Sequence, residues 1–115
     1  MLMLGIEYTD TLTLGSGLVI TEQSIGVGSV THTGPLNGCD GILGLGPLDL
    51  TLDTLVNAPT TTIPTVTRNL WAQDTISEEI FSIFFEPVTS TAIHYGEITF
   101  GGADTSKFTG NMGSA

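Results

Sequence analysis

A chain of 115 residues has the size of one ordinary domain, and its 40% hydrophobic and 12% charged residues are typical of globular proteins and unlike disordered ones. Twelve acidic residues against two basic ones give a formal charge of -10, which repels phosphate backbones and anionic lipid head groups. We therefore expect one domain over residues 1–115, with no nucleic acid and no membrane as partner.

The acidic balance has two readings. It suits a protein that stays folded and soluble in acid, because protonation of its carboxylates then reduces self-repulsion without creating a large positive excess. It fits equally well an acidic, solvated surface that says nothing about the working pH.

The predicted elements begin with a β-hairpin. In residues 7–20, β-branched or aromatic residues alternate with polar ones until the run Gly15-Ser16-Gly17 interrupts them. This pattern predicts two strands joined at the glycines. A further strand is predicted over residues 24–30, and residues 31–38 hold Gly-Pro and Asn-Gly pairs that are typical of turns.

The middle of the chain predicts short elements. Ile42 and Leu43 lie between glycines, which predicts a short buried strand. Residues 48–56 predict one or two helical turns. The clearest helix covers residues 64–71, with Pro64 in its first turn and Thr62 or Ile63 at its cap.

The last third predicts a second short helix and a strand pair. Residues 77–80 predict the helix, with Ser77 as its cap and acidic residues in its first turn. Residues 81–86 and 95–100 predict two paired strands that end at the glycines following residue 100. The sequence therefore predicts a mostly β fold of antiparallel strands with one or two short helices.

Cys39 is the only cysteine, so it has no disulfide partner within the chain, and we expect a buried apolar thiol. Residues 1–5 lack the basic region and the long apolar run of a signal peptide, so we expect no export signal in this chain. No apolar run approaches the roughly 18 residues that span a membrane.

Several segments, in this order, resemble the pepsin-like aspartic peptidases. The most specific is Asp40-Gly41-Ile42-Leu43-Gly44-Leu45-Gly46, which is similar to the strand behind the first catalytic loop of that family. The other similar segments are residues 8–14, 23–27, 63–70, 81–83, 96–102 and 108–110. The resemblance covers residues 5–110, is nearest to the polyporopepsin-like secreted peptidases of basidiomycete fungi, and implies an incomplete N-terminal lobe of a pepsin-like acid protease.

The chemistry of that family needs two aspartates that share one proton across a water, each in an Asp-Thr-Gly or Asp-Ser-Gly loop. This chain has four Asp-Thr pairs, and none is followed by glycine: Asp10-Thr11-Leu12, Asp53-Thr54-Leu55, Asp74-Thr75-Ile76 and Asp104-Thr105-Ser106. By register with the family, both catalytic loops and the flap tyrosine fall outside residues 1–115. We therefore expect no catalytic residue here.

Alignment with the family places Cys39 and Ile42 in the pocket for the side chain that precedes the scissile bond, although a core role fits both residues equally well. His32 and His94 are far apart in sequence and have no associated cysteine or aspartate cluster, so we expect no metal site. Residues 44–47 lack the spacing and the lysine of a phosphate loop, and no cofactor is expected.

Three functions remain open. In the first, the chain is a fragment of an aspartic endopeptidase and is inactive alone. The complete family member hydrolyses peptides or proteins outside the cell at acid pH. Alternatively, it is a non-catalytic remnant that binds peptides or proteins, or self-associates through exposed strand edges. Thirdly, it is a relative that has lost the catalytic pair, as pepsin-like inhibitors and receptors have.

Overall fold

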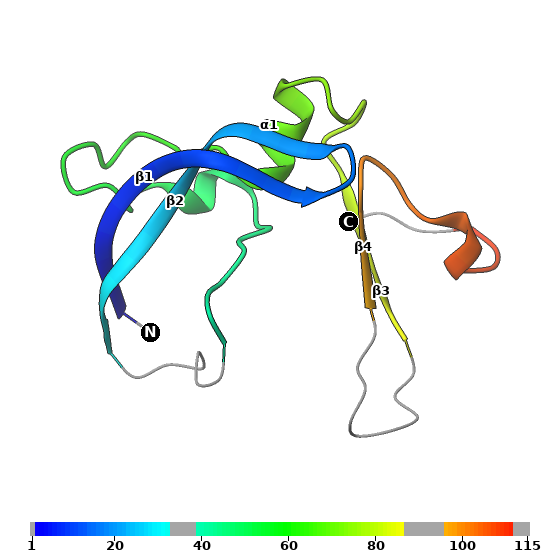
Figure 1. Cartoon of the computed structure of the whole chain (residues 1–115), viewed down its shortest axis with the longest axis horizontal. Coiled ribbons are helices and arrows are strands. Elements are labelled where there is room, and N and C mark those ends of the chain that lie inside the picture. The colour runs from blue at the N-terminus through cyan, green and yellow to red at the C-terminus, as the bar shows by residue number, and fades with distance from the viewer. Residues whose placement is uncertain (1, 33–38, 87–95, 112–115) are drawn as a thin grey trace.

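The structure is a computed structural model that describes residues 2–32, 39–86 and 96–111. Its elements are, in order, β1 (Leu2–Gly15), β2 (Leu18–His32), the 3-10 helix η1 (Leu48–Thr51), α1 (Val66–Ala72), β3 (Phe81–Phe85), β4 (Gly96–Phe100) and the 3-10 helix η2 (Thr105–Lys107). Within these residues, β1 pairs with β2 and β3 pairs with β4, both antiparallel (Figure 1). The prediction of a mostly β fold with antiparallel strands and short helices is confirmed.

The hairpin is longer and more continuous than the sequence predicts. Its strands meet at Ser16 and Gly17, where Gly17 has a φ of 77° that glycine adopts without strain. The two predicted strands after this turn are one strand, β2. Glu22, with a φ of 57°, lies where β2 carries one residue more than β1, which makes a β-bulge. Bulges bend strands, and the hairpin curves along its length (Figure 1).

Helix α1 begins later than predicted. Its N-cap is Thr65, whose hydroxyl accepts a hydrogen bond from the backbone N–H of Arg68 at 3.3 Å. The predicted cap at Thr62 or Ile63 is therefore wrong, and Pro64 precedes the cap instead of lying in the first turn. The prediction of one helical turn after residue 47 is confirmed by η1.

The second short helix predicted at residues 77–80 does not form, so that prediction is wrong. Residues 75–79 form a bend that carries Ile76 into the core, where its side chain is 8% exposed. Immediately afterwards, the carbonyl of Ile80 accepts a hydrogen bond of 2.7 Å from Gly101 N–H. The requirement to bury Ile76 and to begin pairing with the chain after β4 outweighs the local helix signal.

The core lies where the turn end of the hairpin meets α1. Its buried apolar side chains are Ile20, Val66, Leu70 and Ile76, with Leu12, Leu14, Leu18 and Phe100 packed against them. Because Phe100 belongs to β4, this cluster joins both strand pairs and the helix. In Figure 1, α1 accordingly lies behind the turn end of the hairpin, close to the β3–β4 pair.

Two glutamines attach α1 to β2. The amide of Gln73, just after the helix, pairs with the backbone of Thr21: its Oε1 accepts from Thr21 N–H at 3.0 Å and its Nε2 donates to Thr21 O at 2.9 Å. Gln23 is buried, and its Oε1 accepts from Asn69 Nδ2 at 2.9 Å. These bonds satisfy polar groups that lie beside the core.

Candidate functional site

The structure places Cys39 and Ile42 at the surface. Cys39 is exposed, and the side chain of Ile42 keeps 61% of its accessible surface. The predicted buried thiol and the predicted buried strand at Ile42 and Leu43 are therefore wrong. Residues 41–45 pair with no strand among the described residues, so no neighbouring strand covers these apolar side chains. Of the predicted turn at residues 31–38, residues 31 and 32 belong to β2, and residues 33–38 lie outside the described residues.

Of the four Asp-Thr aspartates, Asp53, Asp74 and Asp104 lie at turns or caps, and Asp10 lies in β1 opposite Gln23. Asp10 Oδ1 accepts a hydrogen bond from Thr11 N–H at 2.7 Å. Asp53 has a φ of 61° and its N–H donates to Pro59 O at 2.8 Å, while Asp74 has a φ of 58° directly after the end of α1. Asp104 is the N-cap of η2. Each aspartate thus has a local structural role.

Among the described residues, Asp104 has a carboxyl group whose pKa lies below the ordinary aspartate value. Its Oδ1 accepts hydrogen bonds from the Ser106 hydroxyl at 2.6 Å and from the Ser106 N–H at 3.0 Å. The hydroxyl of Ser106, before any other group, lowers the pKa of Asp104 because hydrogen bonds to a carboxylate favour its charged form.

The two histidines provide no described metal site. His94 and the side chain of His32 lie outside what the structure describes. Among the described residues, no three side chains of histidine, cysteine, aspartate or glutamate gather as metal ligands would. In the same part of the chain, no helix has the length and apolar character needed to cross a membrane.

An open groove lies beside β3, and the sequence analysis did not identify it. It has a volume of about 700 Å³, and its lining residues are Leu45, Gly46, Pro47, Leu48, Thr65, Thr67, Glu79, Ile80, Phe81, Ser82, Ile83, Gly102 and Ala103. Neither Cys39 nor Ile42 lines this groove. The uncharged run of residues 80–85 was the available signal, because such a strand is typical of a binding edge.

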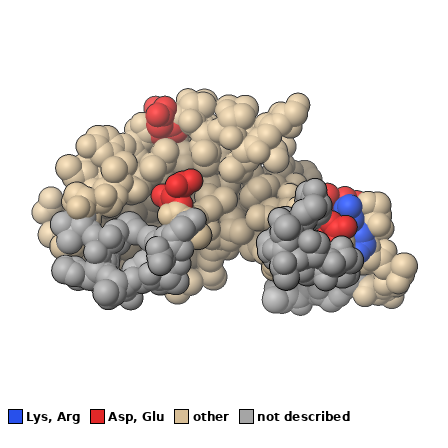
Figure 2. All heavy atoms as spheres, turned by 60° about the horizontal axis from the view of Figure 1, so that its bottom comes forward, with Lys and Arg blue, Asp and Glu red and all other residues tan. Residues whose placement is uncertain are grey.

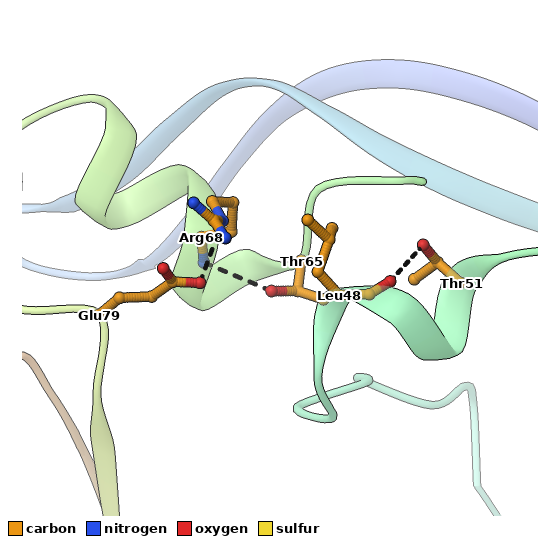
Figure 3. A network of polar contacts seen from close by, with 5 residues as sticks. All are labelled: Leu48, Thr51, Thr65, Arg68 and Glu79. Carbon is orange, nitrogen blue, oxygen red and sulfur yellow. Dashed lines mark hydrogen bonds and ion pairs between the residues drawn. The ribbon is translucent and has the colours of Figure 1, made fainter. Parts of the chain in front are cut away.

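Polar contacts hold the residues around the groove (Figure 3). Arg68 Nε lies 3.1 Å from Glu79 Oε1, but its N–H does not point at that oxygen, so the contact is an ion pair without an aligned hydrogen bond. On the other wall, Thr51 Oγ1 donates to Leu48 O at 2.7 Å and accepts from Ile63 N–H at 2.7 Å. The second pair of contacts fixes η1 against the segment that leads into α1.

The chain resembles known aspartic proteinases in sequence and in structure. The family described as "Eukaryotic aspartyl protease" matches residues 2–115. Polyporopepsin from Irpex lacteus is 53% identical over 108 residues, which are 94% of this chain and 31% of the relative. Rhizopuspepsin-2 from Rhizopus niveus is 37% identical over 109 residues, which are 94% of this chain and 25% of the relative.

A solved structure agrees with this similarity. The crystal structure of aspartic proteinase from Irpex lacteus superimposes with a TM-score of 0.85 at 53% identity, over 93% of this chain and 31% of that chain. This chain thus spans a quarter to a third of the length of these relatives. Because the family matches nearly every residue, the chain belongs to the eukaryotic aspartyl proteases.

Proposed function

We propose that residues 1–115 form part of the N-terminal lobe of an aspartic endopeptidase and do not cleave peptides by themselves. The observation that carries this proposal is 53% identity to polyporopepsin over only 31% of that relative. The four Asp-Thr pairs add support, since none is followed by glycine and their aspartates lie at turns, at a cap or, for Asp10, within β1. In this proposal, the rest of the enzyme supplies both catalytic aspartates and peptides or proteins are its substrates.

Digestion of haemoglobin or casein across acid pH tests this proposal, with and without a transition-state analogue of the statine type. We expect no cleavage by the 115-residue chain at any pH. Cleavage that the analogue blocks would overturn the proposal, because it would require two of these carboxylates to share a proton, within one chain or between two copies.

The groove beside β3 favours a second candidate function, the binding of peptides or proteins without catalysis. Its volume of about 700 Å³ and its open strand edge suit an extended peptide, which binds such edges through main-chain hydrogen bonds. Titration of casein-derived peptides into the chain, followed by the fluorescence of Trp71, tests this function. Saturable binding without cleavage would support it, and an unchanged signal with all peptides would exclude it for these ligands.

We also propose that Cys39 and Ile42 line the pocket for the substrate side chain that precedes the scissile bond. Their exposure supports this role, because a ligand has access to both. An environment-sensitive dye on Cys39, the only thiol, should change its emission when casein-derived peptides are added. A dye on a Gly110→Cys, Cys39→Ser variant is the control, and an equal response at both positions would contradict the assignment.

We propose further that the complete protein is fungal and acts outside the cell. Support comes from relatives in Irpex lacteus and Rhizopus niveus and from an acidic composition that suits an acid medium. An antibody raised against this chain should detect a longer product in the culture medium of the source organism. Detection of the product only inside cells would contradict the location.

A further inference from the structure

Strand β3 has one edge that is paired with β4 and one that is not, within the described residues. Gly101 N–H donates to Ile80 O, and Phe81 lies opposite Phe100. Hydrogen-bonded and non-hydrogen-bonded pairs alternate along an antiparallel ladder. The N–H groups of Ser82 and Phe84 therefore face β4, whereas those of Phe81, Ile83 and Phe85 face the free edge.

The groove runs along this free edge. Five consecutive residues, 79–83, line one wall, and four consecutive residues, 45–48, line the other. Phe81, Ser82 and Ile83 belong to β3, and since successive side chains of a strand point to opposite faces, a cavity lined by all three lies beside the edge and not over one face. Glu79 is the one charged residue among those that line it. At the end of the same strand, Phe85 is 81% exposed.

We propose that this edge binds β3 of a second copy of the chain, antiparallel and centred on Ile83. A two-fold axis at this position places Ile83 opposite Ile83 of the second copy and Phe81 opposite Phe85. These are the residues whose N–H groups face outward, so each pair exchanges two hydrogen bonds. The result is a continuous sheet in the order β4, β3, β3, β4.

The charge of the chain favours this occupant. Phe81–Phe85 has no charge and no proline, although the chain as a whole carries -10. An uncharged strand is the matching occupant for a groove with one charged lining residue, which is itself paired with Arg68. Uncharged runs of high β-propensity at an open edge are the segments that pair between copies. This dimer goes beyond the proposed protease role and does not depend on it.

Sedimentation of the 115-residue chain over a range of concentrations is the first test. Ile83→Pro removes a donor that β4 does not use, so the β3–β4 pair should persist. The matched control Ile83→Val keeps the N–H and the branched side chain. We expect a concentration-dependent dimer whose dissociation constant rises about tenfold or more for the proline variant and changes by less than about threefold for the valine variant.

Two further variants keep the test informative if the proline variant does not fold. Phe85→Lys adds a charge at an exposed side chain without altering the backbone, and it should also weaken the dimer. On a Cys39→Ser background, Ile83→Cys should form an intermolecular disulfide readily, because the axis brings the two Cα atoms to about 5.5 Å. Ser82→Cys is the control, since residue 82 does not lie opposite itself.

Three results would overturn the proposal. The first is a monomer at every concentration, which would leave the groove to another occupant. The second is a dimer that Ile83→Pro and Phe85→Lys both leave unchanged. The third is oxidation that links Ser82→Cys copies as readily as Ile83→Cys copies. The digestion assay is independent of these measurements, so failure of the dimer and failure of the protease proposal are distinguishable.

Discussion

At the scale of single residues, Gly101 shows how the core constrains the backbone. Its φ of 87° is a conformation that L residues rarely adopt, and a Cβ there would lie 2.9 Å from Ile76 Cβ. Gly101→Ala should therefore lower the free energy of unfolding by about 2 kcal/mol, from backbone strain and overpacking. Urea unfolding followed by Trp71 fluorescence measures this change.

Gly102→Ala is the matched control, because a Cβ at this neighbouring position has no atom within 4 Å. It should leave the free energy of unfolding within about 0.5 kcal/mol of the original chain. Equal losses for both variants would contradict the role assigned to Ile76.

Thr67 carries a buried hydroxyl that has no hydrogen-bond partner among the described residues. A buried polar group without a partner costs free energy, so an apolar group of the same shape removes this cost. Thr67→Val should raise the free energy of unfolding by up to about 1 kcal/mol. Thr67→Ser keeps the hydroxyl, loses a methyl group and should be destabilising by a similar amount. A valine variant less stable than the serine variant would show that the hydroxyl has a partner.

At the scale of elements, the end of α1 has the hydrogen bonds of a Schellman motif. Thr75 N–H donates to Leu70 O at 2.9 Å, and Asp74 N–H donates to Trp71 O at 3.1 Å. Asp74 has the left-handed conformation for which this motif prefers glycine. It also places a negative charge at the negative end of the helix dipole.

Asp74→Gly should raise the melting temperature, with a gain of about 1 kcal/mol in the free energy of unfolding. Asp74→Asn removes the charge but keeps the Cβ, and its gain should be only a few tenths of a kcal/mol. A glycine variant no more stable than the asparagine variant would show that the backbone conformation is not strained.

Asp104, the N-cap of helix η2, makes the stability of the fold depend on pH. Hydrogen bonds from Ser106 lower the pKa of this carboxyl group in the folded state. The lowered pKa means that Asp104 stabilises the fold above the ordinary aspartate pKa of about 3.9, and that this contribution is lost as the pH falls through the folded value. The stability difference between the original chain and Asp104→Asn should therefore be largest near neutral pH and shrink in acid.

Ser106→Ala supplies the control for this pH dependence. It removes the hydroxyl that lowers the pKa of Asp104 most, so the added effect of Asp104→Asn should be smaller on this background at neutral pH. An unchanged effect would show that another group stabilises the carboxylate. Chemical unfolding of the four proteins at several pH values provides the measurement.

At the scale of the whole molecule, the fold leaves much apolar surface uncovered. The accessible area is 8755 Å², against about 6000 Å² for a folded monomer of this mass. The radius of gyration is 16.3 Å, against about 13 Å for a compact domain of this length. Figure 2 shows a face on which most of the coloured surface is uncharged, with a few acidic side chains and a basic one beside acidic atoms at one end. The large accessible area and the large radius of gyration both support the proposal that the chain is part of a larger fold.

We therefore expect the isolated chain to be marginally stable and to associate. Large apolar side chains such as Val56, at 94% exposure, should bind the dye ANS at neutral pH and increase its fluorescence. Thermal unfolding should be broad and should depend on protein concentration. A monodisperse monomer with a sharp, reversible transition and no ANS signal would contradict this expectation.

Local patterns predicted the elements whose signals lie within a few residues of one another. The glycines at 15 and 17 predicted the hairpin turn, the periodicity before Trp71 predicted α1, and the alternation at residues 97–100 predicted β4. The order of several motifs also predicted the family, which the comparisons confirm. The prediction that the four Asp-Thr pairs are not catalytic loops needed only the residue that follows each threonine, which is never glycine.

The sequence by itself thus determined the hairpin, helix α1, the family and the absence of an Asp-Thr-Gly or Asp-Ser-Gly motif from residues 1–115. Only the tertiary structure decided that Ile42 is exposed, that residues 77–80 bend and that a groove follows β3. The physical reason is that burial and strand pairing depend on which distant segment covers an element. Ile42 has the sequence pattern of a buried strand, but no described strand lies beside it.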